Sequence, residues 1–93
     1  MNDQRTSIEG ARVLVVGGAG FVGSNLVLRL LAENAAGVCV VDNLLSAEES
    51  NIPVDVRVTK VIGSINDRAV LSEVGTEWDL VFHLATYHGN QSS

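Results

Sequence analysis

The stretch from Val13 to Leu26, VLVVGGAGFVGSNL, constrains the fold of this chain more than any other part of it. A short apolar run ends at a cluster of glycines, and the glycines lead into a segment with helical periodicity. Two glycine spacings are present, Gly18-x-Gly20-x-x-Gly23 and the wider Gly17-x-x-Gly20-x-x-Gly23. A buried strand, a glycine turn and a helix in this order predict a turn that a phosphate group can approach closely.

The rest of the chain continues the alternation of strands and helices. Hydrophobic patterning predicts strands at 12–16, 37–42, 56–62 and 79–84, a helix from Phe21 that ends between 34 and 37, and a helix capped at 66 or 67 that runs to about Val74. Residues 43–55 and those after Leu84 read as polar connections. Such alternation implies right-handed crossovers, so the fold class is α/β with a parallel sheet.

The sheet is expected to be the N-terminal part of a Rossmann doubly wound fold, with strand order 3-2-1-4. A chain of 93 residues forms one domain at most, so residues 1–93 are taken as a partial NAD(P)-binding domain. No helix follows the fourth strand to cover it. We therefore expect the chain to be the truncated beginning of a larger protein.

Composition excludes several classes of function. The net charge of −5 is evenly spread, without a basic run for nucleic acid or an anionic membrane. No apolar stretch approaches the roughly 20 residues of a membrane span, and the N-terminus does not resemble a signal peptide, so a cytoplasmic protein is expected. The single cysteine, Cys39, is interpreted as a buried strand residue, and two histidines with one cysteine cannot build a metal-ligand cluster.

The glycines and a downstream acid together predict NAD. Gly17 permits a tight turn, Gly20 leaves room for a pyrophosphate, and Gly23 lets the helix pack closely on the strand. The free amides and dipole of the helix N-terminus at 20–22 provide an anion site. Asp42 follows Gly23 by 19 residues, where a carboxylate accepts hydrogen bonds from both adenosine ribose hydroxyls.

Alternative interpretations of the same residues differ in how well the sequence supports them. NADP is disfavoured because its ribose phosphate would be repelled by Asp42 and no arginine adjoins that residue. A nucleotide-hydrolase phosphate loop is nearly excluded, since no Gly-Lys-Ser or Gly-Lys-Thr follows the glycines and Lys60 is the only lysine. The remaining alternative is structural: the glycines make only a tight turn, and Asp42 caps a loop.

Four segments carry a resemblance to a known family. VVGGAGFVGSNL, VDNLLS, GSIND and VFHLAT occur in this order along the chain. The sequence resembles the extended short-chain dehydrogenase/reductase family, in particular the NAD-dependent sugar-nucleotide epimerases and dehydratases of the UDP-glucose 4-epimerase type. The resemblance covers essentially the whole chain, and it implies NAD as cofactor, a sugar nucleotide as substrate of the parent protein, and a parent that forms a homodimer.

The resemblance also implies which residues contact the cofactor. The pyrophosphate contacts are implied at Gly17, Gly20, Phe21 and Val22, and the adenosine ribose contacts at Asp42, Asn43, Leu44 and Ser46. Ser64 and Ile65 match the positions that flank adenine, and Leu84, Ala85 and Thr86 match the strand end beside the pyrophosphate and nicotinamide ribose. Two residues depart from the family pattern: Val16 replaces a frequent threonine, and Ser64 replaces an aspartate that usually accepts from the adenine amino group.

No catalytic residue is expected within 1–93. Family members use a Tyr-x-x-x-Lys pair, in which tyrosine is the base and lysine lowers its pKa. The only tyrosine, Tyr87, is followed four residues later by Gln91, so the pair is expected beyond Ser93 and the chain itself is expected to be inactive. His83 is interpreted as a structural, hydrogen-bonded residue, and the TYHGNQSS segment receives no role.

Three function classes therefore remain. The favoured one is the NAD-binding part of an epimerase or dehydratase, which holds the adenosine diphosphate half of the cofactor. The second is a non-catalytic Rossmann-like module for nucleotide sensing or assembly. The third, a protein that binds a flavin or a methyl donor, shares the glycine turn and the acid but is disfavoured by VDNLLS and VFHLAT together.

Overall fold

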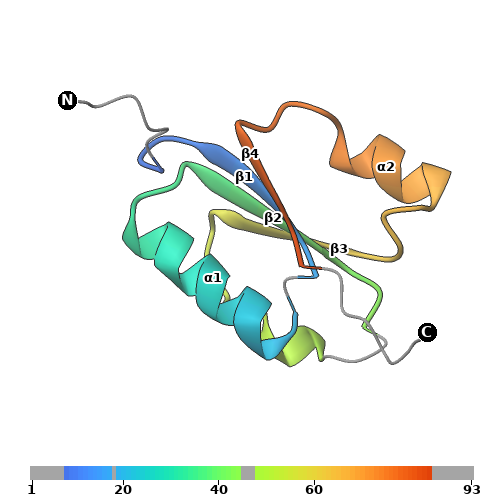
Figure 1. Cartoon of the computed structure of the whole chain (residues 1–93), viewed down its shortest axis with the longest axis horizontal. Helices are drawn as coiled ribbons and strands as arrows, with labels where there is room; N and C mark the ends of the chain where they lie inside the picture. Colours follow the sequence, from blue (N-terminus) through green and yellow to red (C-terminus); the bar gives the residue numbers. More distant parts are fainter. Residues whose placement is uncertain (1–7, 18, 45–47, 85–93) are drawn as a thin grey trace.

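Four parallel strands form one sheet in the order β3-β2-β1-β4 (Figure 1). The structure, a computed structural model, describes residues 8–17, 19–44 and 48–84. Its elements are β1 (Arg12–Val16), α1 (Phe21–Ala32), β2 (Gly37–Asp42), the 3₁₀ turn η1 (Glu49–Asn51), β3 (Val58–Ile62), α2 (Arg68–Val74) and β4 (Leu80–His83). The α/β class and the predicted strand order are confirmed.

The central strands β1 and β2 are buried on both faces, as their almost continuous apolar sequences predict. They pair in register from Arg12 opposite Gly37 to Val16 opposite Val41. Alternate residues point to opposite faces, so Val13 and Val15 lie on one side and Leu14 on the other. Two layers of core therefore form, one on each face of the sheet.

Helix α1 covers the first face. Its buried residues Gly23, Val27, Leu30 and Leu31 recur at helical spacing and pack with the valines of β1 and β2. The helix ends as expected near Asn34, which adopts a left-handed conformation with φ of 67°. The backbone carbonyl of Asn34 accepts the N–H of Gly10 at 2.9 Å, which joins the helix end to the segment before β1.

Helix α2 covers the opposite face. Asp67 caps it as predicted, because its carboxylate accepts the N–H of Ala69 at 2.8 Å. Val70 and Val74 pack against Cys39, Val41 and Val61 from the sheet. Figure 1 shows α1 and α2 on either side of the sheet, which is the layering of a doubly wound fold.

The structure corrects two element boundaries and adds one element. The third strand begins at Val58 and not at Val56, because Asp55 closes a turn in which its carbonyl accepts the N–H of Val58 at 2.9 Å. The fourth strand spans Leu80–His83, within the predicted 79–84. The connection between β2 and β3 contains η1, which the sequence patterns did not predict.

The edge strand β4 is only partly covered. Leu80 and Phe82 pack into the core beneath α1, whereas Val81 and His83 are exposed on the other face. The His83 side chain is exposed and has no hydrogen bond to the described part of the chain, so its interpretation as a structural, hydrogen-bonded residue stays a prediction. The apolar run at β4 does not predict this exposure, because α2 packs over β2 and β3 and leaves the side chains of β4 on that face uncovered.

Candidate functional site

The carboxyl ends of the strands gather the predicted site residues at one edge of the sheet. Because all four strands are parallel, Gly17 follows β1, Asp42 ends β2, Ser64 lies just after β3 and Leu84 just after β4. The strand order reverses between β1 and β4, since the chain first extends from β1 to β3 and then returns to the other side of β1. Ligands of open α/β sheets bind at such a switch point.

Gly17 and Leu84 meet at this switch point. Gly17 has φ of +91°, a conformation that L side chains rarely adopt, and a Cβ atom there would lie 2.8 Å from the carbonyl oxygen of Leu84. The turn is fixed by backbone bonds from Gly17 N–H to Val41 O at 2.7 Å and from Leu84 N–H to Val16 O at 2.8 Å. Only glycine fits this position, as the sequence predicted for the first residue of the turn.

Gly20 is the N-cap of α1, and unlike Gly17 it does not have a backbone conformation that requires glycine. Its φ of −78° is open to any residue, and the nearest atom to a Cβ built there is Gly17 O at 4.0 Å. No side chain caps the helix and its first turn holds no acid, so the first backbone N–H groups are available to an anion. The absent side chain at Gly20 therefore keeps space in front of these amides.

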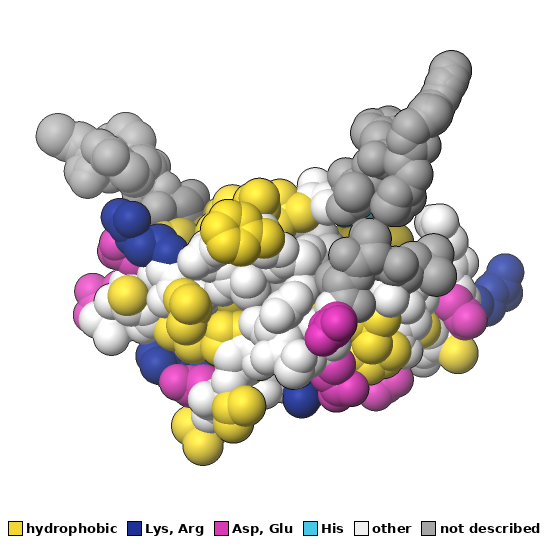
Figure 2. All heavy atoms as spheres, turned by 90° about the horizontal axis from the view of Figure 1, so that it is seen from below, with side chains coloured by type: hydrophobic (Ala, Val, Ile, Leu, Met, Phe, Trp, Pro, Cys, Tyr) yellow, Lys and Arg dark blue, Asp and Glu magenta, His cyan; other side chains and the backbone are white. Residues whose placement is uncertain are grey.

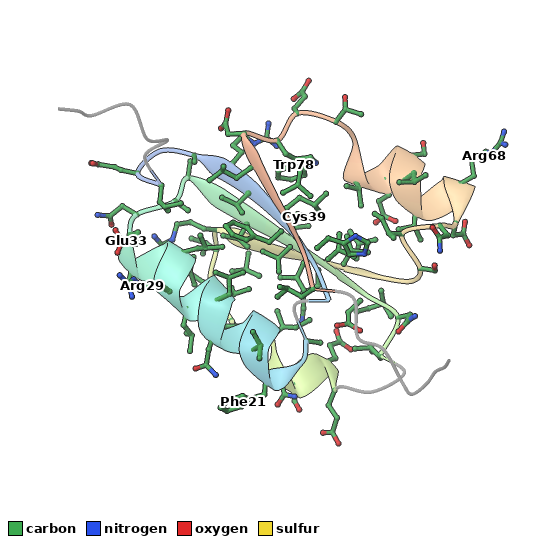
Figure 3. All side chains as sticks on the ribbon, viewed as in Figure 1. Phe21, Arg29, Glu33, Cys39, Arg68 and Trp78 are labelled. Atoms are coloured by element: carbon green, nitrogen blue, oxygen red, sulfur yellow. The ribbon has the colours of Figure 1, made fainter. Side chains whose placement is uncertain are left out.

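Phe21 and Val22 present their side chains to solvent at the start of the helix. They are 82% and 67% exposed, and Figure 3 shows Phe21 pointing away from the sheet. Figure 2 shows further apolar side chains in separate places on the lower face of the molecule. At these two positions the side chains point outward and the backbone N–H groups belong to the first turn of α1, and the pyrophosphate contacts implied there stay a prediction.

The carboxylate of Asp42 is bound to the glycine turn. One oxygen, Oδ2, accepts the N–H of Ala19 at 2.9 Å, and Oδ1 accepts the N–H of Leu44 at 2.7 Å. A carboxylate offers about four acceptor positions, so these bonds use two of them. Asp42 is half-buried, and among the described residues no further donor occupies its other two acceptor positions.

Asn51 is a site residue that sequence reasoning missed. Its Nδ2 donates to the carbonyl oxygen of Ala19 at 3.0 Å across 32 positions of the chain. Together with Asp42 it holds the Ala19 residue, which is fully buried, by both its N–H and its carbonyl. No pattern around Asn51 signals this contact, because it depends on how η1 lies against the start of α1 (Figure 1).

The residues predicted beside adenine follow β3 directly. Gly63 N–H donates to the backbone carbonyl oxygen of Asp42 at 2.9 Å, which places the beginning of this loop next to Asp42. The Oγ of Ser64 accepts the N–H of Asn66 at 3.1 Å, and within the described residues its own proton is donated to no acceptor. Ile65 is half-buried against the core beneath α2. The structure thus brings Ser64 and Ile65 to the same edge as Asp42.

Three of the remaining predicted residues, Ser46, Ala85 and Thr86, lie outside the described residues, as does Gly18. Asn43 is exposed next to Asp42, and Leu44 is half-buried with φ of 62°. The left-handed conformation of Leu44 is stabilised by the bond from its N–H to Asp42. Within the described ranges, the predicted ribose segment therefore wraps around the Asp42 carboxylate.

Other parts of the described chain do not form a second site of comparable definition. A shallow cleft of about 220 Å³ at the amino ends of β1 and β4 is lined by Arg12, Val74, Gly75, Thr76, Glu77 and Trp78. The Arg12 guanidinium lies 4.9 Å from the centre of a Trp78 ring and pairs with Glu77 at 3.2 Å. No predicted site residue lines this cleft.

Neither a metal centre nor a membrane span is found in the parts that the structure describes. Residues 8–17, 19–44 and 48–84 contain no group of three or more side chains suited to hold a metal ion. Over the same ranges, the helices are too short or too polar to cross a bilayer. A cytoplasmic location stays a prediction.

Solved structures with the same fold include an enzyme in complex with NAD⁺ and two epimerases. The enzyme WbmF of Bordetella bronchiseptica in complex with NAD⁺ superposes with a TM-score of 0.84 and 55% sequence identity, over 91% of this chain and 26% of WbmF. WbmF has also been solved with NAD⁺ and UDP together. The fold and this level of identity extend over almost all of the present chain.

Curated relatives agree with this structural likeness. A dTDP-glucose 4,6-dehydratase of Mycolicibacterium smegmatis is 42% identical over 77 residues, which cover 80% of this chain and 23% of the dehydratase. A UDP-glucose 4-epimerase of Streptococcus mutans is 35% identical over 78 residues, 81% of this chain and 23% of the epimerase. The chain spans about a quarter of the length of these relatives.

A family model gives the same assignment over the greater part of the chain. The model of the NAD dependent epimerase/dehydratase family matches residues 13–93, from the first buried valine of β1 onward. The match includes the glycine turn, Asp42 and the ends of all four strands. The chain belongs to the NAD dependent epimerase/dehydratase family.

Proposed function

We propose that this chain binds the adenosine diphosphate half of NAD at the carboxyl edge of its sheet. The observation that carries the proposal is the placement of an uncapped helix N-terminus at Gly20 beside the half-buried carboxylate of Asp42. The helix N-terminus supplies hydrogen-bond donors for a pyrophosphate, and the Asp42 carboxylate supplies acceptors for a ribose. A ligand that needs both at once is a dinucleotide.

The pyrophosphate binds to backbone groups alone. The amides at the start of α1, those of Phe21 and Val22 among them, point along the helix axis toward the position that a phosphate takes. Gly17 lets the chain turn sharply beneath Leu84, and Gly20 removes the side chain that would separate the phosphate from these amides. Ala85 and Thr86 are proposed to border the pyrophosphate and the nicotinamide ribose.

The adenosine ribose binds to Asp42. Its carboxylate has two acceptor positions left after the bonds to Ala19 and Leu44, which matches the two hydroxyls of a ribose diol. A 2′-phosphate would bring a second negative charge against the same oxygens, so NAD is favoured over NADP. Asn43, Leu44 and Ser46 complete this part of the site, and Ser64 with Ile65 flanks the adenine.

The whole protein is proposed to be an NAD-dependent epimerase or dehydratase of sugar nucleotides. Support comes from the relatives, which are named for dTDP-glucose and UDP-glucose, and from WbmF, which binds NAD⁺ and UDP. The bound cofactor would supply reversible hydride transfer. The residues of this chain bind and orient it, while a Tyr-x-x-x-Lys pair is absent from the sequence of 93 residues. Assembly as a homodimer stays a prediction.

Calorimetric titration of the chain at its natural full length tests the binding proposal. NAD and ADP-ribose are expected to bind saturably and with similar enthalpy, because both carry the adenosine diphosphate half. NADP is expected to bind about tenfold more weakly or worse, since a like charge is placed against Asp42. Equal affinity for NAD and NADP would contradict the assigned role of Asp42, and no binding of ADP-ribose by the folded protein would contradict the site itself.

A further inference from the structure

The contact between Asn51 and Ala19 has no counterpart in the motifs that identify the family site. We propose that Asn51 is a positioning residue, which sets the direction of the backbone amides that receive the pyrophosphate. This inference rests on the proposed function, because it concerns the same site. It is carried by the hydrogen bond of 3.0 Å from Asn51 Nδ2 to Ala19 O.

A turn made of glycines needs such a contact. Glycine residues adopt many backbone conformations, so a peptide group next to Gly20 has little intrinsic preference for one orientation. Ala19 lies in this turn with 0% exposure, and side chains from two other elements hold it. Asp42 at the end of β2 accepts its N–H, and Asn51 in η1 donates to its carbonyl.

Peptide geometry transmits the contact to Gly20. The carbonyl of Ala19 and the N–H of Gly20 belong to one planar trans peptide group, so they point in opposite directions. When Asn51 fixes the carbonyl, it also fixes the N–H of the N-cap residue, which then points away from Asn51. A rotated peptide would turn the carbonyl oxygen, a partial negative charge, toward a bound phosphate.

The position of Asn51 is itself well determined. Its N–H donates to Glu48 O at 3.0 Å, and the next residue, Ile52, is 2% exposed in the core beneath α1. The neighbouring Glu49 pairs with Lys60 of β3 at 3.3 Å. The residues of η1 are themselves exposed, but the buried Ile52 directly after it and the pair between Glu49 and Lys60 fix where η1 lies, and so hold the Asn51 amide against the turn.

The test compares ADP-ribose, which carries a pyrophosphate, with adenosine, which carries none. Affinities for ADP-ribose and for adenosine are measured by amide chemical-shift titration of the protein at its natural full length. The variants are Asn51→Ala, which removes the side chain, and Asn51→Asp, which keeps the shape but removes the donor. Ser50→Ala, at an exposed position of the same 3₁₀ turn, is the matched control.

Both Asn51 variants are expected to weaken ADP-ribose about fivefold and adenosine less than about twofold, the loss expected for one partly exposed hydrogen bond. Partial unfolding would lower both affinities by the same factor, so the ratio of the two reports the turn and not the stability. An unchanged ratio, or an Asn51→Asp variant that binds like the wild type, overturns the inference. Failure of the wild type to bind ADP-ribose would overturn the proposed function and this inference with it.

Discussion

The carboxylate of Asp42 accepts the backbone N–H of Ala19 at 2.9 Å, so the residue proposed to bind the ribose also holds the glycine turn. A hydrogen bond therefore joins the two parts of the proposed dinucleotide site within the protein. A change at Asp42 acts on the turn and on the loop at Leu44 as well as on the ribose. Substitution by alanine consequently cannot separate binding from local structure.

Asp42→Asn is expected to lower both stability and NAD affinity. The amide keeps one acceptor oxygen but turns an NH₂ donor toward one of the backbone N–H groups. Hydrogen bonds to a charged group contribute about 1.5–3 kcal/mol, so NAD affinity should fall by about 10- to 100-fold. Calorimetry with NAD and NADP should also show a smaller preference for NAD.

Asp79→Asn is the matched control for this change. The Asp79 carboxylate also accepts a backbone N–H, that of Arg12 at 2.8 Å, but it lies at the amino ends of the strands. We expect this variant to lose stability without a change in the ratio of NAD to NADP affinity. An equal change of that ratio in both variants would show that Asp42 does not contact the ribose.

Gly17→Ala is expected to destabilise the fold strongly. The alanine would have to keep the left-handed φ of Gly17, and its Cβ would lie 2.8 Å from Leu84 O. Gly10 has a similar φ of +77°, but a Cβ added there would have no atom within 4 Å, so Gly10→Ala isolates the conformational cost. The conformational cost alone is about 1–2 kcal/mol, and the steric conflict adds about 1–3 kcal/mol at Gly17. Urea unfolding of both variants measures the difference, and equal losses would contradict the close approach to Leu84.

The ion pair between Asp55 and Arg57 makes stability depend on acid pH. Hydrogen bonds from the Arg57 side chain and backbone lower the pKa of Asp55 to about 2. The folded state then binds the proton less readily than the unfolded chain, whose aspartate has a pKa near 3.9. This contribution is present above about pH 4 and is lost as the pH falls toward about 2.

Asp55→Asn should therefore reduce the decrease in stability between about pH 4 and pH 2. The measurement is the urea midpoint of unfolding across this pH range for the wild type and the variant. Glu48→Gln, which removes a carboxylate at an exposed position of the same connection, serves as the control variant. Parallel curves for wild type and Asp55→Asn would show that Arg57 does not hold the carboxylate in solution.

Cys39 is expected to be unreactive in the folded protein. The side chain is 2% exposed between the sheet and α2, and burial, followed by the charge of Glu73, raises the pKa of the thiol. Both effects disfavour the thiolate, which is the reactive form. Labelling with a thiol reagent at about pH 8 should proceed only as fast as the protein opens, and should become rapid in denaturant. Rapid labelling of the folded protein would contradict the burial of Cys39.

Sequence reasoning succeeded where local patterns decide the structure. The apolar runs located all four strands, and a helix cap was expected at Asn66 or Asp67, of which Asp67 is the cap. Contacts between distant parts of the chain were not accessible in the same way. The bond from Asn51 to Ala19 spans 32 positions, and the exposure of His83 depends on which part of the sheet α2 covers.

The central claim is that the space in front of Gly20 receives the pyrophosphate of NAD. Gly20→Ala tests it directly, because a Cβ there meets no atom of the described chain closer than 4.0 Å and φ of −78° suits alanine. The fold should lose only about 1 kcal/mol, as for an alanine at a helix N-cap. Calorimetric titration should nevertheless show NAD affinity reduced by about tenfold or more, while Gly10→Ala binds like the wild type. Undiminished binding by a folded Gly20→Ala variant would contradict the proposed site.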